Sequence, residues 1–259
     1  MISIKIGAQL YTVRGSMQTP DGIRRTLERV AAIGYRYIQC SGFSFDAPEL
    51  KEICGALALK IRLTHTPADR IVHDTDAVIA EHLLLECPYV GIGSMPREYR
   101  TYEGAKQFLR DFAPAMRAFH NANLKLQYHN HSFEFERFAQ GTMFDALVRG
   151  SDPDLLGFTL DVYWVQHGGK NPVDLIDDLH GRIDVCHCKD MAIKDNAQRF
   201  AAIGDGNLRW QPIFDAFERA GTQYAFVEQD DCYGEDPIDE LERSFRFLQK
   251  SERPSHKNQ

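Results

Sequence analysis

Short apolar runs alternate with amphipathic stretches along nearly the whole chain. Strands are predicted where the apolar runs lie, at residues 2–13, 35–41, 60–65, 89–93, 124–131, 156–161, 183–190 and 224–228. Helices are predicted between them, where apolar residues recur at helical spacing, at 20–34, 47–58, 76–86, 102–122, 141–149, 172–180, 210–220 and 237–249. Gly34 suits the left-handed residue that closes the first helix, and Pro237 suits the first turn of the last.

Eight strand and helix units in succession predict a single-domain α/β fold, the (β/α)8 TIM barrel. Parallel strands need crossovers, and the eighth strand can close on the first. An open doubly wound sheet is the alternative, but it usually has a glycine-rich phosphate turn after its first strand, and residues 9–14 contain no glycine. The barrel is expected to span residues 1–250, with a frayed polar tail at 251–259.

Composition narrows the class of protein further. With 259 residues and 43% hydrophobic content, the chain can bury one large core, and its net charge of -7 disfavours nucleic acid as a partner. No apolar run approaches the roughly 20 residues of a membrane span, and no signal peptide precedes the first strand. The six cysteines lack the spacing of a disulfide framework. We therefore expect a cytoplasmic protein that binds neither nucleic acid nor membrane, and homo-oligomerisation stays open.

Three of the predicted strands end in a side chain that can bind a hard metal ion, namely Asp161, His187 and Glu228. A carboxylate that ends an apolar strand is costly to bury unless it is paired. Because the carboxyl ends of barrel strands meet at one rim, these three side chains are expected to converge there. The sequence therefore predicts a divalent metal site at this rim.

The strand at 183–190 should present two different faces. Alternation places His187 and Lys189 on one face and Cys186 and Cys188 on the other. The two thiols are therefore expected in the core rather than in a zinc site. Lys189 is expected to contact the substrate or a carboxylate, with a solvated rim charge as the alternative.

A fourth metal ligand is expected from the end of the fifth strand. Gln127, His129 and His131 alternate along that strand, and Glu134 lies just past it. Glu134 is preferred because it is the only carboxylate of the segment, and a histidine is the alternative.

Further polar and aromatic side chains fall at the predicted rim. Those expected to bind substrate are Gln9, Tyr11, His65, His129, Trp164 and Lys189. Trp164 would form an apolar wall for a sugar ring. Residues 204–206, Gly-Asp-Gly, follow the seventh strand, where barrels often hold a phosphate, although a tight turn explains this pattern equally well.

Taken together, six motifs resemble the sugar phosphate isomerase/epimerase family of xylose-isomerase-like barrels, over residues 3 to 249. They are Gln9-Leu-Tyr-Thr-Val-Arg14, Tyr128-His-Asn-His131 with Phe133-Glu134, Leu160-Asp-Val-Tyr-Trp164, His187-Cys-Lys-Asp190, Gly204-Asp-Gly206 with Trp210, and Val227-Glu-Gln-Asp230. In the ketose 3-epimerases of this family, Glu, Asp, His and Glu bind a divalent ion, often manganese. The resemblance places the last three at Asp161, His187 and Glu228, and it implies manganese, with magnesium, cobalt or zinc as alternatives.

Two positions depart from the epimerase pattern. Gln127 stands where those enzymes have the strand-five glutamate, and Glu134 corresponds best to their second glutamate a few residues on. Trp164 stands where they have a histidine. Both departures matter, because the epimerase mechanism uses two metal-bound glutamates on opposite faces of an enediolate.

The resemblance implies a metal-dependent isomerase or epimerase that acts on a small sugar, sugar phosphate, cyclitol or related keto compound. Glu228 would be the base, and Glu134, His131 or His65 would return the proton. Since the strand-five glutamate is missing, a dehydratase or lyase on keto-inositols or 3-keto-glycosides is the main alternative. A non-catalytic sugar-binding barrel is a third possibility. An abasic-site endonuclease is disfavoured by the acidic balance and by residues 93–96, which contain no metal ligand.

Overall fold

The computed structural model describes residues 4–251, in which eight parallel strands close into one barrel. These strands are β1 (Lys5–Gln9), β2 (Tyr37–Cys40), β3 (Lys60–His65), β4 (Tyr89–Ile92), β5 (Lys125–His129), β8 (Leu156–Asp161), β9 (Val185–Cys188) and β12 (Tyr224–Val227). Their order around the barrel is β1-β12-β9-β8-β5-β4-β3-β2, with β2 closing on β1. The predicted single-domain TIM barrel is therefore confirmed.

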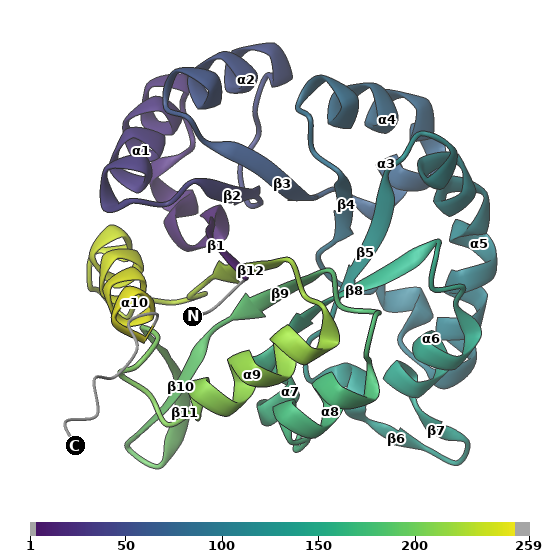
Figure 1. The fold of residues 1–259 in the computed structure, drawn as a ribbon. Coiled ribbons are helices and arrows are strands. Elements are labelled where there is room, and N and C mark those ends of the chain that lie inside the picture. Colours follow the sequence, from purple (N-terminus) through teal and green to yellow (C-terminus); the bar gives the residue numbers. More distant parts are fainter. Residues whose placement is uncertain (1–3, 252–259) are drawn as a thin grey trace.

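Helices surround the strands on the outside (Figure 1). They are α1 (Pro20–Ile33), α2 (Ala47–Ala56), α3 (Ala68–His73), α4 (Thr75–Leu84), α5 (Tyr102–Asn121), α6 (Met143–Gly150), α7 (Val162–His167), α8 (Pro172–Asp178), α9 (Trp210–Ala220) and α10 (Pro237–Ser251). In α5, Phe108, Phe112 and Phe119 recur at helical spacing and are buried, each contributing about 1.5–3 kcal/mol. The outer core thus forms by amphipathic helices packing on the strands. None of the described helices is long and apolar enough to cross a bilayer.

The amino-terminal half of the barrel interior is filled by side chains. Leu63, Tyr89, Val185, Tyr224 and Phe226 form a separate buried cluster there. This cluster is separate from the outer hydrophobic core. The polar residues lie at the other end of the barrel, at the carboxyl ends of the strands.

Several predicted boundaries were wrong. The first strand ends at Gln9, whose side-chain oxygen accepts a hydrogen bond from Tyr11 N and starts the 3-10 helix η1 (Leu10–Ser16). The fifth strand ends at His129, so alternation does not extend to His131. The predicted tail lies outside the described residues except for Ser251, the last residue of α10.

Other elements were not predicted. The hairpin β10 (Asp190–Lys194) and β11 (Ala197–Ala201) leaves the barrel after β9, and a short hairpin, β6 (Arg137–Phe138) and β7 (Gly141–Thr142), follows β5. Short 3-10 turns η2 (Arg97–Tyr99) and η3 (Phe133–Phe135) and the helices α3 and α7 were also missed. These segments lie between the predicted units and shape the carboxyl rim of the barrel.

Candidate active site

Four side chains gather at the carboxyl end of the barrel. His129, Asp161, His187 and Glu228 each offer one ligand atom, and these atoms lie within 4.8 Å of one another. They come from β5, β8, β9 and the residue after β12, and all four are buried. The structure therefore brings together the three side chains that were expected to converge and adds His129 to them.

The orientation of His129 points its free nitrogen at a carboxylate. Its Nδ1 lies 2.9 Å from the carbonyl oxygen of Gly93. A carbonyl only accepts, so Nδ1 carries the hydrogen and Nε2 of the neutral ring keeps its lone pair. This Nε2 lies 3.2 Å from Oδ2 of Asp161. Two electron-rich atoms thus face each other unless a proton or a metal ion lies between them.

His187 repeats this arrangement. Its Nε2 donates to Oε1 of Gln39 over 2.6 Å, while Nδ1 lies 2.9 Å from Oε2 of Glu228 and 3.8 Å from Oδ2 of Asp161. Neither Nδ1 of His187 nor Oε2 of Glu228 has a hydrogen bond of acceptable geometry. Metal-binding histidines usually donate their outer N–H to an oxygen acceptor in this way. The residues present therefore fit a divalent cation bound by two imidazole nitrogens and two carboxylate oxygens.

The ammonium of Lys189 lies on the same carboxylates. Its Nζ is 3.0 Å from Oδ2 of Asp161, from Oε2 of Glu228 and from Oδ1 of Asp230, and the side chain is buried. Burial raises the pKa of Asp161, but Lys189 and His129 outweigh it and lower that pKa to about 2. Burial likewise opposes the charge of Lys189, yet the three carboxylates raise its pKa above the ordinary value. Lys189 is therefore a fixed cation inside the site rather than a solvated rim charge.

Glu134 does not belong to this cluster. The turn η3 folds its side chain back, so that Oε1 accepts from the Tyr128 hydroxyl at 2.7 Å and Oε2 from His131 N at 2.8 Å. Tyr128 points into the outer core, opposite to His129, so Glu134 lies behind the barrel wall. Burial raises its pKa to about 7. The structure thus places His129, the alternative, where Glu134 was expected.

Two other predicted residues, His65 and His131, lie beside the cluster. The ring centroid of His65 lies 5.7 Å from that of His187, and that of His131 lies 4.9 Å from that of His129. Burial, followed by the neighbouring His129, lowers the pKa of His65 well below its usual value and that of His131 to about 3. Both imidazoles are therefore neutral. Tyr11 lies under the Arg14 guanidinium, 3.9 Å from it, rather than against the cluster.

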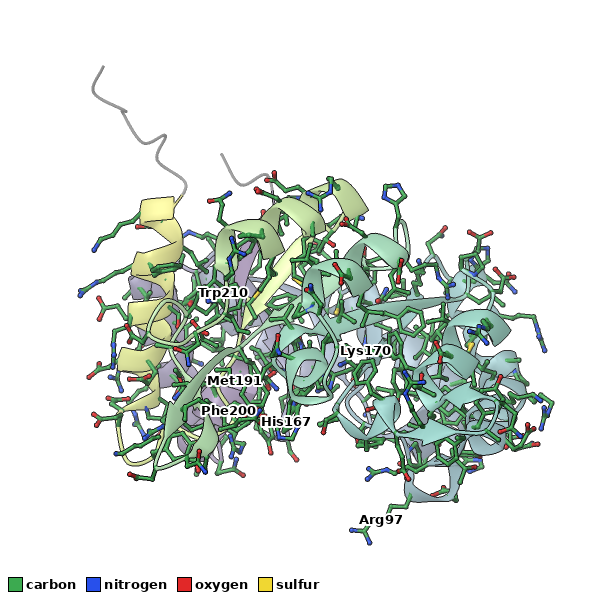
Figure 2. All side chains as sticks on the ribbon, turned by 90° about the horizontal axis from the view of Figure 1, so that it is seen from below. Arg97, His167, Lys170, Met191, Phe200 and Trp210 are labelled. Carbon is green, nitrogen blue, oxygen red and sulfur yellow. The ribbon has the colours of Figure 1, made fainter. Side chains whose placement is uncertain are left out.

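Aromatic side chains line one side of the mouth. The ring centroid of Trp164 lies 5.3 Å from that of His131 and 5.8 Å from that of Phe200, and the ring of Phe133 stacks on His131 at 5.6 Å. Figure 2 shows Phe200 next to His167, and both rings lie against Tyr163. We refer to Phe133, Tyr163, Trp164 and Phe200 as the aromatic wall.

Comparison with known proteins agrees with this architecture. A family model described as Xylose isomerase-like TIM barrel matches residues 18–251. The chain belongs to the xylose isomerase-like TIM barrel family. No curated protein matches the sequence.

Solved structures resemble this family member in fold. A sugar phosphate isomerase/epimerase from Parabacteroides distasonis has 23% identity and a TM-score of 0.79, over 97% of this chain and 96% of that one. An L-ribulose 3-epimerase has 17% identity and a TM-score of 0.73, over 95% and 94%. A probable 3-DHS dehydratase from Bacillus anthracis has 12% identity and a TM-score of 0.72, over 95% and 99%.

In this xylose isomerase-like barrel, the loop with residues 204–206 is filled by a carboxylate of the chain itself. Asp190 accepts from the backbone N–H groups of Gly204, Gly206 and Leu208 at 2.9, 3.2 and 3.1 Å, and from the indole Nε1 of Trp210 at 2.7 Å. Trp210 is labelled in Figure 2. Residues 204–206 form a turn, and its backbone donors at Gly204 and Gly206 face Asp190.

Sequence reasoning assigned no contact to three groups of the site. Gln39 and the carbonyl of Gly93 hold the outer nitrogens of the two histidines, and Asp230 is the third carboxylate on Lys189. Gln39 lies near the end of β2, next to Gln9 in register. The role of Gly93 leaves no signal, because a backbone carbonyl is present at every position.

Proposed function

We propose that this protein is a metal-dependent isomerase or epimerase, which moves a proton next to the carbonyl group of a small polyhydroxylated compound. The observation that carries this proposal is the pair of inner nitrogens on His129 and His187, each of which faces a carboxylate oxygen at close range. Family membership and the names of similar structures, which include a 3-epimerase, support the same reaction class.

The donor set indicates which cation would be held. Two imidazoles with two carboxylates suit manganese and its first-row neighbours better than magnesium or calcium, which prefer oxygen alone. A divalent cation bound here would supply Lewis-acid polarisation of a carbonyl group. Manganese, which the family resemblance implies, remains our first choice, with cobalt and zinc next and magnesium last.

We assign proton removal to Glu228, the only glutamate among the cluster residues. Burial alone would raise its pKa, but Lys189 and then His187 lower that pKa well below the usual value, so the carboxylate is ionised. Lys189, His65 and His131 border the cluster and are placed to orient substrate oxygens. Trp164 would hold the apolar face of a sugar ring.

Buried polar atoms without a partner support a polyhydroxylated substrate. Such atoms are Nε2 of Gln9, Gln39 and His65, Nδ1 of His131, and Nε1 of Trp164. An unpaired buried donor or acceptor costs about 1–3 kcal/mol, which a ligand hydroxyl would recover. Their gathering around the carboxyl end of the barrel is expected for a site that binds several hydroxyl groups.

Exchange of solvent deuterium tests the proposal. Protein reconstituted with Mn²⁺ should incorporate deuterium at the carbon next to the carbonyl in at least one member of a panel of ketoses and keto-inositols, as read by NMR. Removal of the metal with EDTA should stop the incorporation. If metal binding is verified and no compound of the panel exchanges deuterium, the proposed function is wrong.

A lyase is the second candidate, and one observation favours it. Glu228 is the only glutamate among the cluster residues, because Glu134 lies behind the barrel wall, so the cluster offers no second glutamate to act on the opposite substrate face. Lys189 lies 3.0 Å from Glu228 and would assist departure of a hydroxide or alkoxide. Loss of water or of an aglycone in the product mass spectrum would separate elimination from isomerisation.

A further inference from the structure

We infer that the substrate of this site is uncharged, and that phosphate esters are excluded. This inference rests on the proposed function and narrows its substrate class to free sugars, keto-cyclitols and related neutral polyols. Three independent features of the described residues carry it. They are the filled loop after β9, the engaged cations at the mouth and the neutral character of the unpaired polar atoms.

Three backbone donors of the loop after β9 are already bonded. In TIM barrels the loops after the seventh and eighth strands often form the phosphate site. Here three backbone N–H groups and the indole of Trp210 all point at the carboxylate of Asp190, which has no exposed surface. A phosphate would have to expel this buried carboxylate to reach the same donors. The loop is thus an anion site that the chain fills itself.

The cations at the mouth are engaged as well. Arg14 donates to two backbone carbonyl oxygens at 2.7 and 3.1 Å. Arg100 donates to a backbone carbonyl at 2.9 Å and to a hydroxyl at 3.1 Å, and it covers the ring of Phe133 at 4.1 Å. Lys189 is surrounded by three carboxylates. A phosphate dianion would gain none of these three cations without breaking their contacts, and the carboxylates would repel it.

Around the cluster, several polar atoms of amide, imidazole and indole groups have no hydrogen-bond partner. Gln9, Gln39 and Trp164 carry no charge at any pH. Such groups match hydroxyl groups, which both donate and accept. The aromatic wall beside them suits the apolar face of a neutral ring. The term sugar phosphate in the names of similar structures therefore does not extend to this chain.

Matched pairs of ligands test the inference. Binding of D-fructose and D-tagatose to the Mn²⁺-loaded protein is compared with that of their 6-phosphates by calorimetry, so the result does not depend on turnover. Each neutral sugar should bind at least about tenfold more tightly than its phosphate ester, a difference of about 1.4 kcal/mol. The opposite preference would overturn the inference. A neutral preference without any deuterium exchange would leave the inference standing and remove the proposed function.

Two variants test whether the aromatic wall contributes to the binding of neutral sugars. Trp164→Ala should weaken binding of the neutral sugars about tenfold and leave the Kd for Mn²⁺ unchanged, since Trp164 is not a metal ligand. Tyr37→Ala, an aromatic residue in the amino-terminal half of the barrel, should change neither value and serves as the matched control. Equal losses in both variants would mean that the aromatic wall is only structural.

The loop is tested by removing its carboxylate. Asp190→Gly should melt at lower temperature than the wild type, and sulfate, a tetrahedral dianion like phosphate, should restore part of the loss by occupying the freed donors. The same sulfate concentration should stabilise the wild type less, since the general exclusion of sulfate from protein surfaces acts on both proteins. A wild type that is stabilised by sulfate as much as the variant would contradict a self-filled anion site and, with it, the exclusion of phosphate.

Discussion

Nζ of Lys189 lies 3.0 Å from Oε2 of Glu228, the same oxygen that faces Nδ1 of His187. The ammonium therefore shares its carboxylate oxygens with the candidate metal site. It also shares Oδ2 of Asp161 in this way, whereas its contact with Asp230 lies outside the cluster. In the absence of metal, Lys189 compensates the buried negative charge, and a cation that enters must compete with it.

Lys189→Met should reveal this competition. Without the ammonium, the buried carboxylates lose their partner, so the metal-free protein should lose about 3–5 kcal/mol of unfolding free energy. Its affinity for Mn²⁺ should rise roughly tenfold, because a nearby positive charge is gone. Urea unfolding in EDTA and calorimetry with Mn²⁺ measure the two effects.

Lys125→Met is the matched control for that variant. Lys125 pairs with Asp184 at 2.9 Å, both partly exposed and away from the cluster. Its loss should reduce stability slightly and leave the Kd for Mn²⁺ unchanged. Weaker metal binding in Lys189→Met would show that the ammonium supports the metal rather than competing with it.

Two variants compare His129 and Glu134 as the fourth metal ligand. His129→Gln should weaken Mn²⁺ binding by about 10²-fold, because it removes an imidazole donor. Glu134→Gln should leave the affinity unchanged, because both oxygens of Glu134 are bonded to Tyr128 and His131. Calorimetry on the two variants decides between them, and the reverse pattern would restore Glu134 as the ligand.

Glu228→Gln should separate binding from chemistry. The amide still offers an oxygen but cannot take a proton, so deuterium exchange should fall by about 10²-fold or more. The affinity for the neutral sugar should change little. NMR exchange rates and calorimetry test this, and an unchanged exchange rate would remove Glu228 as the base.

The buried carboxyl of Glu134 predicts a pH dependence of stability. Its pKa rises from 4.5 to about 7 on folding, mainly through burial. Between these values the folded chain keeps a proton that the unfolded chain has released. The unfolding free energy should therefore fall as the pH rises through this window, by roughly 3 kcal/mol at most.

Urea unfolding of wild type and Glu134→Gln across pH 4.5 to 7 measures this contribution. The difference between the two proteins isolates Glu134 from the other titrating groups. Glu136→Gln, at an exposed position two residues after Glu134, should follow the wild type. Parallel curves for wild type and Glu134→Gln would show that the carboxyl is ionised throughout.

The barrel and three members of the cluster could be predicted from sequence for a simple physical reason. Buried parallel strands are continuous apolar runs, and a charged or imidazole side chain at the end of such a run stands out, as at Asp161 and His187. The fourth position was harder, because the fifth strand ends at His129 and the chain then turns. Whether Glu134 lies inside the barrel or outside it depends on that turn, and neither hydrophobic periodicity nor composition predicts the turn.

Because Asp190 follows Lys189 directly, the segment from His187 to Asp190 should tolerate no change in length. His187 and Lys189 face the mouth, while Cys186, Cys188 and the Asp190 carboxylate lie on the other side. An insertion or deletion of one residue in this segment would exchange the faces and bring thiols into the mouth. Insertions, inserted domains and labelling tags should instead be tolerated at the exposed hairpin tip, residues 195–196. The backbone there already turns through positive φ, and an insertion at the tip does not change which way residues 187–190 face.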